Sequence, residues 1–328
     1  MNTTGNEKTF FIDEENAGGR LDKFLATVLP GHSRSRLAQL VKDGHVLINQ
    51  ALVLPKQKLR VSDTVHVSLP PPRSADLTPQ DIPLDIVYHD EDIVIVDKAA
   101  GLIVHPGAGH PDGTVVNGLL HRFQTLSPIG LPERPGVVHR IDRGTSGILV
   151  FARNERSHNH LARQFAAHSA HRLYRALAWD HNLPDNGTYS TLYGRQTKDR
   201  RKFTTDVLDG KSAVTHWTVS ERLGPCALVE VQLETGRTHQ IRVHLSEFGN
   251  PLVGDPMYGR KRRIERIPRL RQMGWEFGLE RQALHAAQLG FVHPSTGQDM
   301  FFESPCPEDM QGVLKALRYV PPPPKTGS

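Results

Sequence analysis

Apolar residues recur along the first part of the chain at helical spacing and are then followed by short runs typical of strands. From residue 21 to 29 they return every three or four positions, and the spacing resumes at residues 37–41, after serines that can cap a helix. Short apolar runs follow at residues 45–48 and 64–69. We therefore expect a small unit of two helices and a few strands.

Beyond residue 84 the apolar runs are short and often alternate with polar residues, as strands with one covered face do. Helical spacing is predicted at residues 155–167 and 238–247, and the strand-like runs lie at residues 93–96, 147–151, 173–179, 213–219 and 227–233. Because strands and helices do not alternate strictly, the pattern predicts an α+β fold. We expect a mixed, mainly antiparallel sheet flanked by helices, not a doubly wound sheet.

Proline-rich and polar stretches divide the chain into parts. The run from Leu69 to Pro83 interrupts both helix and strand periodicity, which indicates a linker. We predict a disordered tail at residues 1–17, a small domain at 18–72, a linker at 73–84, a large domain at 85–319 and a proline-rich tail at 320–328.

Length and composition narrow the class of protein. The 328 residues suffice for two domains, and no apolar run approaches the length of a membrane span. The N-terminus lacks the features of a secretory signal and the only cysteines are Cys226 and Cys306, so we expect a cytoplasmic protein with no membrane partner, and a monomer. The net charge of +5 permits a polyanionic partner without proving one.

The densest polar segment of the large domain spans residues 137–150. Asp142 stands there between Arg140 and Arg143, directly before an apolar run. Guanidinium neighbours favour the ionised form of a carboxylate, which makes Asp142 a candidate nucleophile or base. The alternative is a structural Arg–Asp pair that closes a turn, and the residue pattern alone leaves both open.

A second polar cluster spans residues 233–244, where Arg237 follows a glycine turn before a predicted helix. His239 and His244 do not have the i, i+4 spacing of a helical metal site, and neither cysteine nor carboxylate completes a ligand set. The chain also lacks a glycine-rich nucleotide loop. We therefore predict no metal and no cofactor.

Two basic segments suit phosphate oxygens. Arg34 and Arg36 flank the start of the second helix of the small domain, where free backbone amides also point outward. Residues 259–271 form a concentrated basic run. Each segment taken alone is more often simply a solvated surface.

The small domain resembles the RNA-binding domain named after ribosomal protein S4. Three elements carry the likeness, at residues 19–25 (GRLDKFL), 33–37 (SRSRL) and 44–49 (GHVLIN). The resemblance implies that Arg34, Arg36 and Lys42 face RNA.

The large domain resembles the pseudouridine synthases of the RluA-type family. Residues 139–147 (HRIDRGTSG) and 233–244 (LETGRTHQIRVH) match its two most specific motifs, and residues 97–106, 251–259 and 281–286 also agree. The likeness runs in collinear order over residues 18–315. It therefore implies an enzyme that isomerises uridine in RNA.

The resemblance also implies roles for individual residues. Asp142 becomes the catalytic aspartate, Tyr174 packs against the target base, and Arg237 pairs with the aspartate. Arg140 reaches into the space of the flipped nucleotide, and His105 and Thr145 lie nearby. The basic run at Arg260, Arg262 and Arg263 then grips phosphates. Departures from the family pattern occur at Ala99, Ile141 and Gly144.

One branch of the family matches at residues 104–115, which implies uridines of the helix 69 stem-loop of large-subunit ribosomal RNA as the target. The alternatives are another ribosomal or transfer RNA site, a catalytically silent ribosome-assembly factor that binds RNA, and a metal-dependent nuclease. Chelator sensitivity and RNA shortening distinguish the nuclease from an isomerase.

Overall fold

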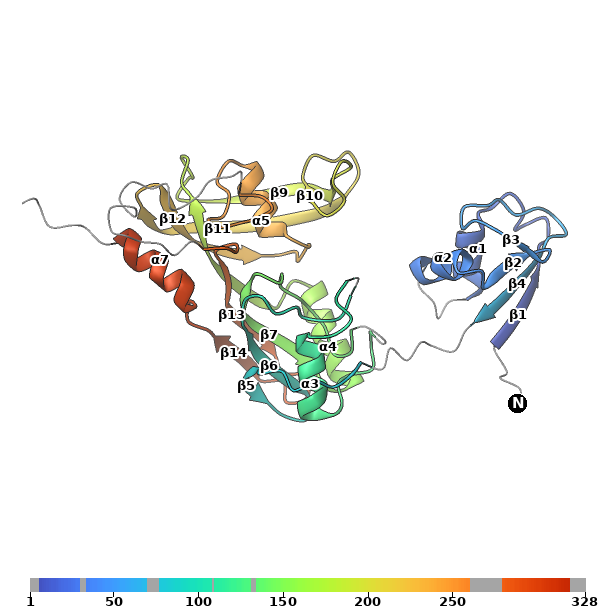
Figure 1. The fold of residues 1–328 in the computed structure, drawn as a ribbon, viewed down its shortest axis with the longest axis horizontal. Coiled ribbons are helices and arrows are strands. Elements are labelled where there is room, and N and C mark those ends of the chain that lie inside the picture. The colour runs from blue at the N-terminus through green and yellow to red at the C-terminus, as the bar shows by residue number, and fades with distance from the viewer. Residues whose placement is uncertain are drawn as a thin grey trace, which may run out of the picture. The chain divides into compact units, whose positions relative to one another are not determined.

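The computed structural model describes residues 6–29, 34–69, 77–107, 109–130, 134–259 and 279–318. The chain divides into two compact units, Met1–Asp76 and Leu77–Ser328, and the division falls inside the stretch for which the sequence predicts a linker (Figure 1). Among the described residues, the helices are too short or too polar to span a membrane.

The first unit holds a four-stranded antiparallel sheet and two helices. Its core joins the helix residues Leu21, Leu25 and Leu37 to Val65 and Val67 of the last strand. The strand order is β1-β4-β2-β3. The elements are β1 (Asn6–Phe11), α1 (Leu21–Val28), α2 (Arg34–Lys42), β2 (Val46–Ile48), β3 (Ala51–Leu52) and β4 (Thr64–Leu69).

Strand β1 corrects the prediction of a disordered tail over residues 1–17. It pairs with β4 along its whole length, from Asn6 opposite Leu69 to Phe11 opposite Thr64. The residues Asn6–Thr9 are polar, so hydrophobic periodicity gave no signal there. An edge strand is held by backbone hydrogen bonds to its neighbour, which do not depend on side-chain type.

The second unit is built on a ten-stranded sheet in the order β10-β9-β11-β12-β8-β13-β7-β6-β5, with β14 paired to β13. Its paired strands are antiparallel except β7 and β13, which run parallel. The predicted α+β fold with a mixed, mainly antiparallel sheet is therefore confirmed. The strands are β5 (Asp85–His89), β6 (Ile93–Lys98), β7 (Ser146–Ala152), β8 (His171–Trp179), β9 (Asn186–Arg195), β10 (Phe203–Thr204), β11 (Lys211–Leu223), β12 (Cys226–Leu233), β13 (Leu284–Val292) and β14 (Asp299–Glu303).

Strand β7 is buried on both faces, which explains its uninterrupted apolar sequence. Leu149 and Phe151 join the core beneath α3 (Val115–Phe123), whereas Ile148 and Val150 join the core that includes α4 (Glu155–Ala166). Helix α4 starts cleanly because Asn154 Oδ1 accepts a hydrogen bond of 2.9 Å from the Ser157 amide.

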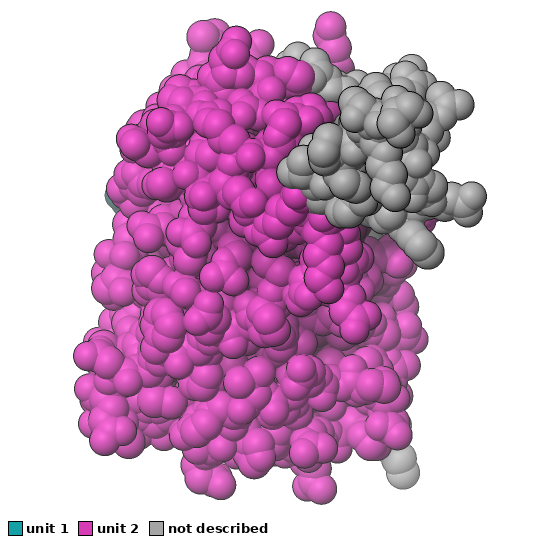
Figure 2. Space-filling view, turned by 90° about the vertical axis from the view of Figure 1, so that its left-hand side faces the viewer, with its two compact units in different colours: residues 1–76 teal, residues 77–328 magenta. Residues whose placement is uncertain are grey.

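The other half of the sheet is covered in the same way by two further helices. Tyr174 and Ala176 of β8 pack in one core with Ile241 of α5 (Gln240–Glu247). Leu177 and Trp179 lie in a second core with α7 (Glu308–Arg318). In space-filling view the described side chains of the second unit pack into one continuous body (Figure 2).

Gly147 marks the point where β7 meets β13 most closely. Its φ is +115°, and a Cβ at this position would lie 2.2 Å from the carbonyl oxygen of Ala286. Only glycine fits both the backbone angle and the space. The loop that precedes β7 is thereby fixed beside β13 and its neighbour β8.

Candidate active site

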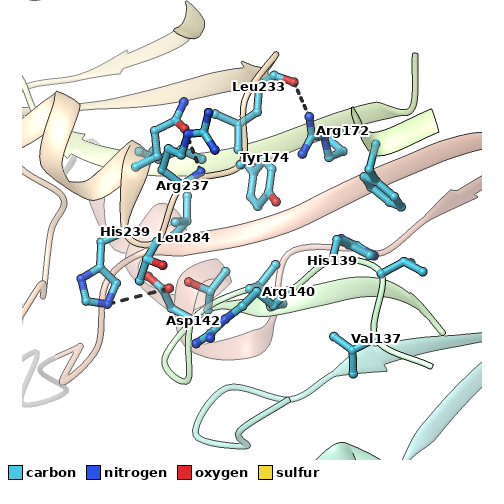
Figure 3. A pocket seen from close by; sticks show the side chains of 18 of the residues that line it. Val137, His139, Arg140, Asp142, Arg172, Tyr174, Leu233, Arg237, His239 and Leu284 are labelled. Carbon is cyan, nitrogen blue, oxygen red and sulfur yellow. Dashed lines mark hydrogen bonds and ion pairs between the residues drawn. The ribbon is translucent and has the colours of Figure 1, made fainter. Parts of the chain in front are cut away.

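A cavity of about 440 Å³ opens between the loop before β7, helix α4, strand β8 and the segment leading into α5. Its volume falls in the range of small-ligand sites. Figure 3 shows Asp142 and Arg140 on one side of the cavity and Tyr174 on the other. Six residues predicted from the sequence line it: His105, Arg140, Asp142, Thr145, Tyr174 and Arg237.

The loop that carries Asp142 is a tight turn braced by a glutamine. The Thr145 amide donates to the Asp142 carbonyl oxygen at 3.0 Å, and Gln282 Nε2 donates to Thr145 Oγ1 at 3.1 Å. A Cβ at Gly144 would meet Gln282 Oε1 at 2.6 Å. A larger residue at position 144 would therefore require the end of the Gln282 side chain to shift.

Lys98 ties the same loop to the end of β6. Its ammonium group donates to the carbonyl oxygens of Ala99, Leu102 and Arg143, at 2.9, 2.8 and 3.2 Å. Burial lowers the pKa of Lys98 to about 7, although the nearby charge of Asp142 acts in the opposite direction. Lys98 thus anchors the loop that carries Asp142 to the end of β6.

The cation that pairs with Asp142 is Arg242, which corrects the assignment to Arg237. Arg242 Nη1 donates to Asp142 Oδ2 at 2.9 Å. Arg242 lies on the inner face of α5 and is 5% exposed, so the pair is largely shielded from water. A helix-borne guanidinium can approach the carboxylate from within the core, which a residue in the preceding turn cannot do here.

Arg237 lies in the cavity wall, and one nitrogen of its guanidinium group is bound to the backbone of β11. Its Nε donates to the Ser212 carbonyl oxygen at 3.0 Å, and its amide donates to Gln240 Oε1 at 2.9 Å. Arg237 therefore remains available to a ligand in the cavity through the rest of its guanidinium group, but not as the partner of Asp142.

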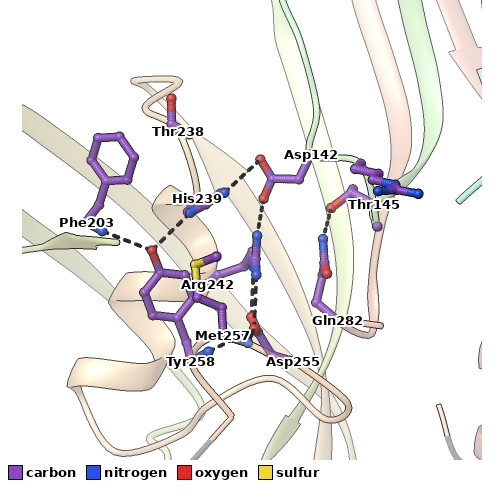
Figure 4. A network of polar contacts seen from close by, with 12 residues as sticks. Asp142, Thr145, Phe203, Thr238, His239, Arg242, Asp255, Met257, Tyr258 and Gln282 are labelled. Atoms are coloured by element: carbon purple, nitrogen blue, oxygen red, sulfur yellow. Dashed lines mark hydrogen bonds and ion pairs between the residues drawn. The ribbon is translucent and has the colours of Figure 1, made fainter. Parts of the chain in front are cut away.

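A second carboxylate, Asp255, completes a charged triad with Arg242 and Asp142 (Figure 4). Its oxygens accept from Arg242 Nε and Nη2 at 2.8 and 3.0 Å, in a bidentate pair. Burial alone would raise the pKa of Asp255, but the bonds from Arg242 outweigh it and lower that pKa. Burial likewise opposes the charged form of Arg242, yet the two carboxylates raise its pKa. Arg242 is therefore fixed as a cation.

Tyr174 occupies the central strand β8, opposite Val231 of β12 and Ala286 of β13. It is 7% exposed, and burial raises its pKa, so the phenol stays protonated at neutral pH. Arg172, two residues earlier, also lines the cavity. The period of two in a strand places both side chains on the same face.

Arg140 and His105 meet at the cavity edge. Arg140 Nη1 donates to His105 Nε2 at 3.3 Å, while His105 Nδ1 donates to the Pro106 carbonyl oxygen at 2.8 Å. Arg140 is exposed overall, and the partial burial of its guanidinium lowers its pKa. Both residues lie where the sequence predicts them, beside Asp142.

The described structure does not test the remaining predicted RNA-binding residues. Lys42 is exposed on α2 of the first unit. The side chains of Arg34 and Arg36, and the residues Arg260, Arg262 and Arg263, lie outside what the structure describes. Their assignments stay predictions.

Several residues of the site were missed by sequence reasoning. Helix α5 starts at Gln240, two residues later than predicted, because His239 adopts a left-handed backbone with φ of 61°. The side chain of Gln240 holds this turn. Its Oε1 accepts a hydrogen bond of 2.8 Å from Thr235 Oγ1, and its Nε2 donates one of 3.0 Å to the Val214 carbonyl oxygen. The available signal in the sequence was a set of polar residues, Gln240, Arg242 and His244, interleaved with the apolar residues of the predicted helix.

One group of metal-type side chains lies elsewhere, formed by Asp90, Asp92 and His293. Its carboxylate oxygens already accept hydrogen bonds: Asp90 from His293 Nε2 at 2.9 Å and Asp92 from Ser157 Oγ at 2.6 Å, with further donors around both. The group ties the β5–β6 turn to α4 and to the end of β13, as a structural brace.

Comparisons with known proteins show which family this chain is similar to. A family model described as RNA pseudouridylate synthase matches residues 92–247, and the S4 domain model matches residues 19–65. A Zymomonas mobilis protein named ribosomal large subunit pseudouridine synthase D is 45% identical over 311 residues, 93% of this chain and 96% of that protein. A Bacillus subtilis protein, the uncharacterized RNA pseudouridine synthase YlyB, is 43% identical and spans 95% of this chain and 99% of that protein. The solved structure of human RNA Pseudouridylate Synthase Domain Containing 1 has a TM-score of 0.52 and 26% identity, and the match covers 74% of this chain and 98% of that chain.

Proposed function

This chain belongs to the RluA-type RNA pseudouridine synthases and carries an N-terminal S4 domain, and from that premise we propose that it isomerises uridines in the helix 69 stem-loop of large-subunit ribosomal RNA with Asp142 as the reacting group. The enzyme class is an intramolecular isomerase. The target and the residue roles are argued below.

The reaction rearranges one nucleoside without adding or removing atoms overall. The bond from ribose carbon 1′ to uracil nitrogen 1 breaks, the ring turns, and carbon 1′ bonds to carbon 5. The hydrogen on carbon 5 is lost and nitrogen 1 gains a proton. No electron leaves or enters the nucleoside, so the protein must supply charge control and positioning.

The paired Asp142 carboxylate in an arginine-rich cavity is the observation that carries the proposal. Among the described residues that line the cavity, Asp142 is the only carboxylate, and Arg242 holds it at 2.9 Å. The cavity has an excess of positive charge, which suits a polyanionic ligand such as RNA. The lining arginines are Arg134, Arg140, Arg172, Arg237 and Arg242.

A stacked uridine cannot reach this cavity, so the target nucleotide must be turned out of its helix. Arg140 at the cavity edge fits the role of filling the vacated place. The ring of Tyr174, which lines the cavity, can hold the freed base by stacking, worth about 1–3 kcal/mol. Asp142 then lies across the cavity from the base. It can add to the sugar, add to the ring or abstract a sugar proton, and all three steps need an ionised carboxylate.

The substrate proposal rests on relatives and on the first unit. Relatives named ribosomal large subunit pseudouridine synthase D align over more than nine-tenths of the chain. The S4 domain adds a second RNA-binding unit, in which Lys42 is exposed. We take the enzyme to act in the cytoplasm, as a monomer, on the large subunit or its precursor.

Mapping pseudouridine in ribosomal and transfer RNA from cells with and without this protein tests the proposal. We expect the helix 69 signals to disappear without the protein and to return with the wild-type gene but not with Asp142→Asn. Loss of pseudouridine at another site would replace the proposed target. An unchanged map would instead support a silent assembly factor.

A further inference from the structure

The two oxygens of Asp142 have different surroundings. Oδ2 accepts the hydrogen bond from Arg242 Nη1. Oδ1 accepts none from the residues that the structure describes, and His239 Nε2 lies 3.9 Å from it. That distance is too long for a hydrogen bond but close enough for a directed electrostatic contact. His239 is thus aimed at the oxygen that Arg242 leaves open (Figure 4).

The His239 ring is held from its far side by Tyr258. The Tyr258 hydroxyl lies 3.0 Å from His239 Nδ1, and it accepts a hydrogen bond of 3.0 Å from the Phe203 amide. The Phe203 amide occupies one lone pair of the hydroxyl oxygen and leaves the hydroxyl hydrogen free to be donated to Nδ1. With that donation the ring carries its own hydrogen on Nε2, the nitrogen that faces Asp142.

Packing and burial fix this orientation. The rings of Phe203 and Tyr258 meet the imidazole edge-on, at centroid distances of 5.7 and 5.6 Å. The His239 side chain is 17% exposed. Burial lowers the pKa of His239, while the charge of Asp142 acts against this. The ring is therefore neutral at neutral pH, as the hydroxyl bond to Nδ1 requires.

The position of the His239 ring depends on a strained backbone conformation, with φ of 61°. A left-handed conformation at a residue other than glycine costs on the order of 1 kcal/mol or more. At His239 the neighbouring Gln240 side chain offsets this cost, because its amide group bonds to Arg237, Thr235 and β11. An ordinary helical start would not direct the ring toward Asp142.

We propose that His239, with its tautomer set by Tyr258, is a positioning residue that orients Asp142 so that Oδ1 is the oxygen that reacts. The inference rests on the proposed function of Asp142. The Nε2–H group at 3.9 Å steers Oδ1 toward the nucleoside without neutralising it, whereas Oδ2 remains bound to Arg242. Tyr258 acts only through His239.

The variants His239→Leu, His239→Gln, Tyr258→Phe and the double variant His239→Leu/Tyr258→Phe test this chain of contacts. The assay is release of tritium from RNA carrying uridine labelled at carbon 5. We expect His239→Leu to lower kcat by on the order of 10–100-fold with little change in KM, since misplacement of a reacting group costs that much. His239→Gln, which keeps an N–H donor, should recover most of the loss.

Tyr258→Phe should lower kcat by about 3–10-fold, and the double variant should be no slower than His239→Leu. Two residues that act independently of each other would instead give multiplied losses. Multiplied losses, an unchanged kcat in His239→Leu, or equal losses in the Leu and Gln variants would each overturn the proposal.

A second measurement does not depend on activity or on the choice of RNA. Nitrogen-15 NMR of histidine-labelled protein, with the His239 signals identified by their loss in His239→Gln, reports the tautomer directly. We expect a neutral ring with its hydrogen on Nε2 at pH 7, and a mixed tautomer in Tyr258→Phe. A charged ring, or hydrogen on Nδ1, overturns the inference even if the enzyme is active. If the tautomer is as expected but the wild-type protein is inactive on every RNA, the proposed function is wrong, whereas the His239 contacts stand.

Discussion

Arg242 bonds to two carboxylates, and we predict that replacing Asp255 mainly lowers stability whereas replacing Asp142 mainly abolishes activity. The perturbations are Asp255→Asn and Asp142→Asn, which remove one negative charge each and leave the side-chain shape nearly unchanged. Asp255 has a side chain with 0% exposure and a bidentate bond to Arg242. Asp142 is 15% exposed and makes one such bond.

The magnitudes follow from burial. Breaking a buried ion pair by removing one partner costs about 3–5 kcal/mol, and Asp255→Asn should fall near the lower end because Arg242 keeps Asp142. Asp142→Asn loses one partly exposed charge-assisted bond and should cost only about 1 kcal/mol. The difference of about 2 kcal/mol corresponds to a gap in urea midpoint of roughly 1 M.

Tryptophan fluorescence in urea measures the stability of the second unit alone. Trp179, Trp217 and Trp275 all lie beyond residue 76, so the first unit contributes no signal. Tritium release from RNA labelled at carbon 5 measures turnover. We expect no turnover by Asp142→Asn and roughly 1–10% of wild-type turnover by folded Asp255→Asn, in which Asp142 is still held.

The reasoning is refuted if Asp142→Asn is destabilised as much as Asp255→Asn, or if it still turns over RNA. RNA binding serves as the control for both proteins, because neither side chain is part of the positive lining of the cavity. Each variant should bind RNA within about threefold of wild type.

Three further predictions concern stability. Gly147→Ala should cost about 2–4 kcal/mol, since the new methyl group would meet the Ala286 carbonyl at a φ of +115°; Gly312→Ala, inside helix α7 with open space around it, should instead stabilise by about 0.5–1 kcal/mol, and equal effects in urea unfolding would contradict this. Partial burial opposes ionisation of Asp92, but its hydrogen bonds lower its pKa to about 2, below the 3.8 of the unfolded chain, so the stabilisation is full above pH 3.8 and lost as pH falls toward 2. Asp92→Asn should therefore be about 1–2 kcal/mol less stable at pH 6, with the gap closing near pH 2, and a gap that does not change with pH would count against the assignment. Burial lowers the pKa of Lys98 to about 7 from 10.5, so the unfolded chain binds more protons than the folded protein between these two pH values. The free energy of unfolding should therefore rise with pH across that window, and Lys98→Met should lack this part of the rise. Identical pH profiles of the two proteins would contradict the prediction.

The sequence alone predicted the two-part organisation and the meeting of Asp142 with Tyr174, although these residues are far apart in the chain. The apolar runs located the strands, and the family resemblance predicted that Asp142 and Tyr174 belong to one site. The structure adds the reason: Gly147 fixes the loop of Asp142 against β13, next to the strand that carries Tyr174.

The partner of Asp142 could not be chosen correctly from the sequence. Arg237 and Arg242 occur in the same motif, and the left-handed turn at His239 separates Arg237 from helix α5, whose buried residues include Arg242. That turn depends on hydrogen bonds from Gln240 to β11, a contact between segments distant in sequence. Strand β1 was missed for a similar reason, since its pairing with β4 leaves no periodic pattern in its polar residues.

The most direct test of the account is turnover of large-subunit ribosomal RNA by purified wild-type protein and by Asp142→Asn, followed by pseudouridine mapping and tritium release. The account predicts helix 69 pseudouridine and stoichiometric tritium release with the wild type, and RNA bound but unchanged with the variant. Pseudouridine formed by Asp142→Asn would contradict the central role of this carboxylate.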